Sequence, residues 1–137
     1  FLFGGGVMIT LKTLGEASEQ SVFDQVAGHL LRQGKQSMYG TNCYYRMGDL
    51  SCAVGCLIGD DEYYFKMEGK TYRRFFVDHG TTARHYDLLV ELQRLHDGKD
   101  PVAWCAALRD LAEEYGLSAA VVDGFDRVVE EVEAVYG

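Results

Sequence analysis

The sequence has few of the features that mark secreted, membrane-spanning or disordered chains. Among its 137 residues there are one proline and four cysteines. No apolar run approaches the roughly 20 residues that are needed to span a bilayer. The cysteines are too few for a disulfide scaffold, and the lack of low-complexity stretches argues against disorder. We therefore expect a soluble, cytoplasmic protein with free thiols and no disulfide bond.

The N-terminal residues 1–7 also lack the features of a signal peptide. There is no basic start, and the apolar part is three residues long before Gly4, Gly5 and Gly6 interrupt it. We expect residues 8–137 to form a single globular domain and residues 1–7 to lie outside it, as a flexible segment or one foreign to the natural protein. The alternative is a genuine apolar N-terminal peptide on a glycine hinge.

Basic residues are outnumbered and unevenly spread. The formal net charge is −8, and the segment from Asp97 to the C-terminus contains ten acidic residues and three basic ones. Nucleic-acid binding needs a basic footprint, so this balance makes a nucleic-acid partner improbable. It leaves room for a local basic patch.

Apolar residues at helical spacing predict a first helix after Ser18, a residue type that caps helix N-termini. Gly34 is the expected end of this helix, because glycine readily adopts the left-handed conformation that closes a helix. The apolar stripe consists of Val22, Phe23, Val26, Ala27, Leu30 and Leu31.

The C-terminal half predicts three more helices joined by short linkers. The first begins at Thr81 or Thr82 and ends at Gly98, the second follows the Asp100-Pro101 pair, and Ser118 caps the last. Linkers of two or three residues favour antiparallel packing of neighbouring helices.

Short runs with β character lie between the first two helices. Cys43–Arg46 and Leu50–Val54 flank the turn residues around Gly48, which predicts an antiparallel β-hairpin. Residues 72–77 are a candidate third strand. The predicted fold class is thus α+β and mainly helical, with four principal helices and a small hairpin between the first and the second.

Three cysteines are the densest candidate site. A two-residue turn at Met47-Gly48 would pair Arg46 with Asp49 and thereby place Cys43 opposite Cys52. Cys56 follows four residues later, and His79 or His85 would supply a fourth zinc ligand.

The spacing of these cysteines is poor for a zinc knuckle, and their apolar neighbours favour a buried core in which cysteine acts as a small hydrophobe. We therefore expect no zinc and no other cofactor, with Cys52 and Cys56 at least partly buried. A thiol site built from Cys43, Cys52, Cys56 and His79 is the alternative. His79 is the one histidine placed in a plausible loop site, whereas His96 lies beside a helix end, where a cation interacts well with the helix dipole.

Two charged segments allow more than one interpretation. Asp60, Asp61 and Glu62 could hold a divalent metal, but carboxylates also gather in the first turn of a helix, which is the reading we favour. The basic and aromatic strip at Lys70–Phe76 is typical of a core edge, of a protein contact or of single-stranded nucleic-acid binding.

Several segments resemble a set of small uncharacterised proteins of bacteriophages, prophages and bacterial genomes. The most distinctive is Cys52–Tyr63, which reads CAVGCLIGDDEY and is preceded by Cys43–Arg46. Ser21–Ala27, Leu92–Asp97 and Ala107–Leu117 also resemble that set. The resemblance implies a mobile-element context and carries no activity, cofactor or catalytic residue.

The sequence contains no nucleotide-binding loop, metalloprotease motif or nucleophile elbow, so an enzyme would need a site assembled from unrelated positions. We therefore expect a small accessory protein that binds and modulates a host protein. The alternative is a thiol- or metal-dependent enzyme or a single-stranded nucleic-acid-binding protein that uses the cysteines and residues 70–74. Self-association stays open. The expected contact residues are Glu113, Glu114, Glu130, Glu131, Glu133, Tyr72, Arg73 and Arg74.

Overall fold

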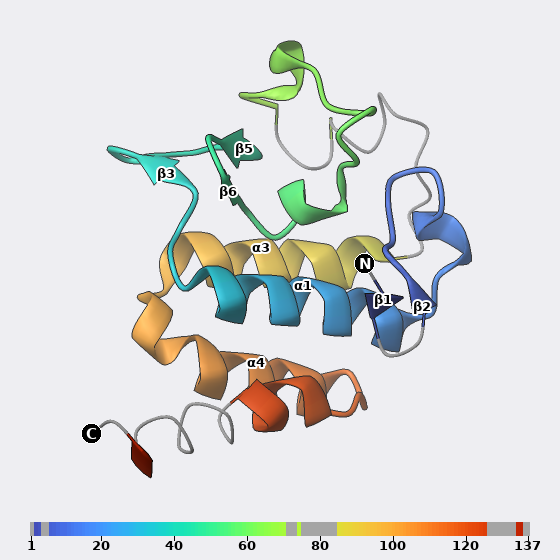
Figure 1. The fold of residues 1–137 in the computed structure, drawn as a ribbon, viewed down its shortest axis with the longest axis vertical. Helices are drawn as coiled ribbons and strands as arrows, with labels where there is room; N and C mark the ends of the chain where they lie inside the picture. The colour runs from blue at the N-terminus through green and yellow to red at the C-terminus, as the bar shows by residue number, and fades with distance from the viewer. Residues whose placement is uncertain (1, 4–5, 71–73, 75–84, 126–133, 136–137) are drawn as a thin grey trace.

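The computed structural model describes residues 2–3, 6–70, 74, 85–125 and 134–135 (Figure 1). Within these residues the chain is mainly helical and carries small antiparallel strand pairs after the first long helix, as the sequence predicts. Figure 1 shows α1 and α3 side by side, with α4 on one side of them and the hairpins and loops of residues 38–70 on the other.

The first long helix, α1 (Glu19–Gln33), matches its predicted bounds. The Ser18 side chain accepts a hydrogen bond from the Ser21 backbone N–H, and Gly34 closes the helix with a φ of 65°. The predicted apolar stripe is buried. Residues within this stripe therefore supply the centre of the core.

The two other long helices are α3 (Tyr86–Gly98) and α4 (Trp104–Glu114). The short 3₁₀ helix η5 (Pro101–Ala103) precedes α4, and Asp100 caps it through a bond from the Val102 N–H. Figure 1 shows α4 running back along α3, the predicted antiparallel arrangement. Ser118 accepts a bond from the Ala120 N–H, and the last helix is described over residues 120–125. Thr81 and Thr82 lie outside the described residues.

The predicted hairpin is two hairpins, and its predicted register is wrong. β3 (Met38–Tyr39) pairs with β4 (Asn42–Cys43), and β5 (Arg46–Met47) pairs with β6 (Leu50–Ser51). Arg46 therefore lies opposite Ser51 instead of Asp49. The turns are Gly40-Thr41 and Gly48-Asp49, and both glycines have positive φ at the first turn position, where a type II′ turn requires glycine. The position of glycine within the turn thus sets the register.

Further short elements complete the described chain. β1 (Leu2–Phe3) pairs with β2 (Gly6–Val7), and three 3₁₀ helices follow at Leu14–Glu16 (η1), Gly55–Leu57 (η2) and Phe65–Met67 (η3). Gly55 is required by close approach, because a Cβ atom there would overlap the Tyr45 carbonyl. Of the candidate strand 72–77 only Arg74 is described, and it is helical and exposed. No described helix has the length and apolar character needed to cross a membrane.

Three glutamines of α1 hold distant segments through their side-chain amides. Each amide accepts a bond from the backbone N–H of one residue and donates a bond to the carbonyl of that same residue. The pairs are Gln20 with Ser118, Gln25 with Ile9, and Gln33 with Ser51. In the buried pair, the Ile9 N–H lies 2.6 Å from Gln25 Oε1. Side-chain amides thus take the place of strand pairing in a region with little regular sheet.

Two carboxylates, those of Glu62 and Glu68, organise the loops through hydrogen bonds from backbone N–H groups. Glu62 accepts bonds from the backbone N–H groups of Leu11, Lys12 and Gly59, and Glu68 accepts bonds from those of Tyr45 and Arg46. The expectation that residues 60–62 open a helix is wrong, because they form a turn. Asp61 pairs with Lys12 and Asp60 with Arg46. These carboxylates therefore join loops and are not gathered around one point.

Candidate functional site

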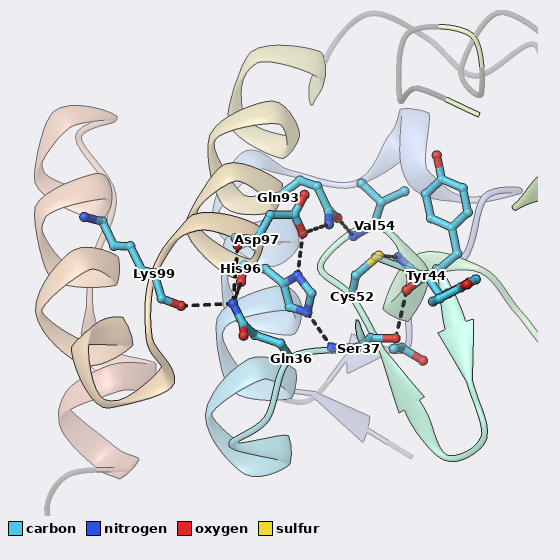
Figure 2. Close-up of polar contacts among 12 residues, drawn as sticks. Gln36, Ser37, Tyr44, Cys52, Val54, Gln93, His96, Asp97 and Lys99 are labelled. Carbon is cyan, nitrogen blue, oxygen red and sulfur yellow. Dashed lines mark hydrogen bonds and ion pairs between the residues drawn. The ribbon is translucent and has the colours of Figure 1, made fainter. Parts of the chain in front are cut away.

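The candidate site lies at the C-terminal end of α3, against the β3–β4 hairpin. His96 is fully buried there and stacks on Trp104, with ring centroids 5.8 Å apart. Its Nε2 atom accepts the Ser37 backbone N–H at 2.9 Å, and its Nδ1 atom lies 2.7 Å from Asp97 Oδ1 (Figure 2). Because Ser37 N–H can only donate, the ring proton must lie on Nδ1, which donates to Asp97. The prediction of a cationic His96 that interacts with the helix end is not what the geometry favours.

Asp97 is the acceptor on which this network converges. Gln93, one helical turn earlier, donates to its carboxylate at 2.8 Å and uses its Oε1 atom to accept the Val54 N–H at 3.0 Å. Burial acts to raise the pKa of Asp97, but hydrogen bonds from His96, Cys43 and Gln93 outweigh it and hold the pKa below its usual value. Asp97 is therefore an ionised group at neutral pH.

Gln36 and Ser37 add further hydrogen bonds between the end of α3 and the chain around β3 and β4. Gln36 Nε2 donates to the carbonyl of His96 at 2.8 Å and to that of Lys99 at 3.2 Å, so it caps the end of α3 (Figure 2). Ser37 Oγ donates to the Tyr44 carbonyl at 2.8 Å, and the Tyr44 N–H returns a bond to the Ser37 carbonyl. The network thus fastens the chain around β3 and β4 to α3.

A cavity of about 340 Å³ opens beside this network. Cys43, Cys52, Gln93 and Asp97 contribute polar atoms to its wall. The remaining lining residues are Tyr44, Tyr45, Gly69 and Lys70. The structure therefore brings Cys43 and Cys52 to one cavity. They are not cross-strand neighbours, because Cys43 pairs with Met38 in the β3–β4 hairpin.

The thiols are poor nucleophiles in this setting. Burial, reinforced by the Asp97 carboxylate, raises the pKa of Cys43 to about 12, and burial raises the pKa of Cys52 to about 12 as well. Burial likewise raises the pKa of Cys56. Cys52 is buried and Cys56 is partly buried, as predicted. Because the thiolate is the reactive form, these shifts disfavour nucleophilic chemistry.

Cys43, His96 and Asp97 also form a group whose potential ligand atoms lie within 4.8 Å of one another. A metal on His96 Nδ1 would move the ring proton to Nε2, where it would face the Ser37 N–H. Two donors would then oppose each other in a buried site, and the Ser37 N–H would lose its acceptor. The arrangement therefore suits a hydrogen-bond network that joins Ser37 to α3 better than it suits a metal centre.

One predicted member of the thiol site, Cys56, does not join this cluster. Cys56 lines a different cavity and its thiol donates to the Ala53 carbonyl. His79 lies outside the described residues. Sequence reasoning missed Gln36, Ser37 and Gln93. The available signal was the spacing of Gln93 and Asp97, which lie four residues apart and therefore on one side of α3.

A second group of polar residues gathers around Tyr115 at the end of α4. Burial raises the pKa of Tyr115, and the carboxylates of Glu91, Asp87, Glu114 and Glu19 raise it further. We call these four carboxylates the acidic face. They come from the N-terminal turn of α1, from α3 and from the last turn of α4.

The structure places some of the predicted contact residues and not others. Glu113 and Glu114 are exposed, and Glu114 belongs to the acidic face. Glu130, Glu131, Glu133, Tyr72 and Arg73 lie outside the described residues. Sequence reasoning missed Glu19, Asp87 and Glu91, although the spacing of Asp87 and Glu91 places both on one side of a helix.

Comparison of the chain with known protein families, with curated proteins and with solved structures gave no match.

Proposed function

We propose that the protein acts by binding another protein, and that its acidic face docks on a basic surface of that partner. One observation carries the proposal: burial and the charges of four carboxylates on three different helices raise the pKa of Tyr115. Tyrosine is enriched at protein interfaces, because its ring supplies apolar contact area and its hydroxyl supplies a hydrogen bond. A tyrosine whose ionisation is opposed by neighbouring carboxylates suits a partner that presents lysine or arginine.

Part of the acidic face supports the helices, because Glu91 pairs with Arg94 at 2.9 Å and Glu19 and Asp87 lie in first turns, where negative charge favours the helix dipole. Other carboxylates of this surface bring no evident benefit to folding. Asp87 and Glu91 are like charges four residues apart on α3, an arrangement that destabilises a helix by a few tenths of a kcal/mol, about 0.2–0.5. Glu113 and Glu114 lie in the last turn of α4, which contains no basic residue, and negative charge there opposes the helix dipole. Within the described part of the chain no ion pair or hydrogen bond engages either of these two side chains. Unfavourable surface charge of this kind supports a role in recognition.

Other classes of function find less support in the geometry. A thiol enzyme would need a nucleophile, but burial keeps the thiols of Cys43 and Cys52 protonated. Both ring nitrogens of His96 already have partners. A surface of carboxylates repels nucleic-acid phosphates. The resemblance to phage and prophage proteins suggests a bacterial host protein in the cytoplasm as the partner, whose action this chain would modulate.

The test is affinity capture from a bacterial lysate with three forms of the tagged protein. These are the unmodified chain, the variant Glu91→Lys with Glu114→Lys, and the control Asp49→Lys. Asp49 is exposed at the β5–β6 turn, which lies across α1 and α3 from α4 in Figure 1. The bound proteins are quantified by mass spectrometry at low and at 0.3 M salt.

We expect basic proteins that the unmodified chain and Asp49→Lys retain at low salt, and that the acidic-face variant does not. Retention should fall at high salt, because exposed charges are screened within about 10 Å at 0.1 M. A partner that all three forms capture equally, at either salt concentration, would rule out the acidic face as the docking surface. A complete absence of partners alongside turnover of a small molecule would overturn the binding function itself.

A further inference from the structure

A second cavity, unrelated to the acidic face, gathers positive charge in this acidic protein. It has a volume of about 340 Å³ and lies between α1, residues 8–10 and the turns of residues 55–60. Two arginines line it, Arg32 of α1 and Arg46 of β5, together with His29 and one carboxylate, Asp60. Ile9 and Ile58 contribute apolar wall. This volume lies within the range of small-molecule sites, about 300–1,000 Å³.

The guanidinium group of Arg46 is held in a fixed position. Its Nη2 atom donates to the Ile58 carbonyl at 2.9 Å, and the group lies over the Tyr63 ring, 4.7 Å from the centroid. Its Nη1 atom pairs with Asp60 at 3.0 Å, but the Asp60 side chain is 98% exposed. An ion pair with so exposed a partner contributes little, so another anion can replace Asp60 at modest cost.

Arg32, which is exposed, also lines this cavity. Desolvation lowers the pKa of His29, and the nearby Arg32 charge lowers it further. Burial raises the pKa of Cys56, and the Arg32 charge opposes that rise. His29 and Cys56 both line the cavity, so the positive charge of Arg32 acts on groups from two of its walls.

The histidine offers a further polar atom. Its Nε2 atom lies 2.9 Å from the Ser51 carbonyl, which can only accept, so Nε2 carries the ring proton and donates it. The Nδ1 atom consequently bears a lone pair. A ligand with a hydroxyl or a protonated oxygen next to its anionic group could donate to that atom.

We propose that this cavity binds a small ligand with an oxyanionic group, a carboxylate or a phosphate, held between Arg32 and Arg46. Arginine suits this task because its planar fork of N–H groups matches both anions and stays charged at every physiological pH. The apolar wall would contact the remainder of the ligand. The site is separate from the acidic face, and its test does not depend on any protein partner.

The experiment is a nuclear magnetic resonance titration of the ¹⁵N-labelled full chain with sodium phosphate and, separately, with sodium acetate. Sodium chloride at matched ionic strength serves as the salt control. The variants are Arg32→Gln and its matched control Lys35→Gln, which removes the same charge from an exposed residue just past α1 that does not line the cavity. The signals followed are the backbone amides of Ser51, Gly55 and Gly59.

We expect saturable shifts of these amides with at least one of the two anions, in the unmodified chain and in Lys35→Gln. Arg32→Gln should weaken that binding at least tenfold, and Arg32→Lys should recover part of it. Whichever anion binds more tightly identifies the group that the site prefers. Equal affinities in Arg32→Gln and Lys35→Gln, shifts that sodium chloride reproduces, or no saturable shift with either anion would each overturn the proposal.

Discussion

The Ser37 backbone N–H donates to His96 Nε2 at 2.9 Å and thereby decides which nitrogen of the ring carries the proton. The proton on Nδ1 then goes to Asp97, whose carboxylate also accepts from Gln93. Two residues 59 positions apart in sequence thus fix the chemistry of the whole network. Because both ring nitrogens of His96 are hydrogen-bonded, the residue joins the hairpin region to α3 and has no ring nitrogen left for a substrate or a metal.

Replacing His96 should strongly destabilise the fold. His96→Ala removes a fully buried ring that stacks on Trp104 and leaves the Ser37 N–H without its acceptor. We expect a loss of about 2–5 kcal/mol in the free energy of unfolding, measured by urea denaturation. His96→Gln, which can offer an amide oxygen to Ser37, should recover part of that loss. Equal losses in the two variants would show that the acceptor is unimportant.

The buried amide pair should matter more than the exposed one. Gln25→Met keeps the side-chain volume but leaves the N–H and carbonyl of Ile9 unpaired in a buried position. We expect a cost of about 2–3 kcal/mol in the free energy of unfolding. Gln20→Met removes the same kind of pair with Ser118, where water can replace the amide, and should cost less than about 1 kcal/mol. Equal urea midpoints for Gln25→Met and Gln20→Met would contradict the prediction that the buried pair matters more.

Stability should fall as the pH drops below the usual histidine range. Desolvation, together with the charge of Arg32, lowers the pKa of His29 from its ordinary value of 6.5, so the unfolded chain binds a proton more readily than the folded one. The free energy of unfolding should therefore decrease as the pH falls through about 6.5 and level off once the folded pKa is passed.

The variant His29→Gln isolates this effect, because it removes the titrating group and keeps a donor for the Ser51 carbonyl. The dependence of stability on pH between 7.5 and 5.5 should become shallower in that variant. Urea denaturation at several pH values measures it. An unchanged slope would mean that His29 has the same pKa in the folded and unfolded chains.

The thiols of Cys43, which is partly buried, and Cys52, which is buried, should resist alkylation while the protein is folded. With the pKa of Cys43 and of Cys52 raised to about 12, the thiolate is scarce at pH 8. We expect iodoacetamide to modify both at least about tenfold more slowly than in urea-unfolded chain, as followed by peptide mass spectrometry. Rapid alkylation of either cysteine in the folded protein would revive the interpretation as a reactive-thiol site.

Charge reversal at the end of α4 should stabilise the helix and weaken partner binding at the same time. Glu114→Lys replaces a charge that opposes the helix dipole with one that favours it, so the free energy of unfolding should rise by about 0.3–1 kcal/mol. Asp110→Lys, an exposed change in the middle of the same helix, should have a smaller effect on stability. A thermal unfolding series compares them. A loss of stability in Glu114→Lys would remove the argument that this residue is kept for recognition.

The sequence by itself determined the helices and most of the described ends, but not the start of α3, which lies at Tyr86 and not at Thr81 or Thr82. Ser18, Gly34, Asp100 and Ser118 act on backbone groups a few residues away, and the apolar stripes follow the helical period, so local rules suffice to place them. The partial burial of Cys56 and the burial of Cys52 followed in the same way from their apolar neighbours.

Only the tertiary structure decided how the polar side chains are used. The hairpin register depends on which turn position glycine occupies, and Cys43 lies in a separate hairpin, where it pairs with Met38 instead of Cys52. The His96 network joins residues 36–54 to the end of α3, and the acidic face draws carboxylates from α1, α3 and α4. Such groupings arise because helix packing brings distant positions together, and no local pattern in the chain specifies that distance.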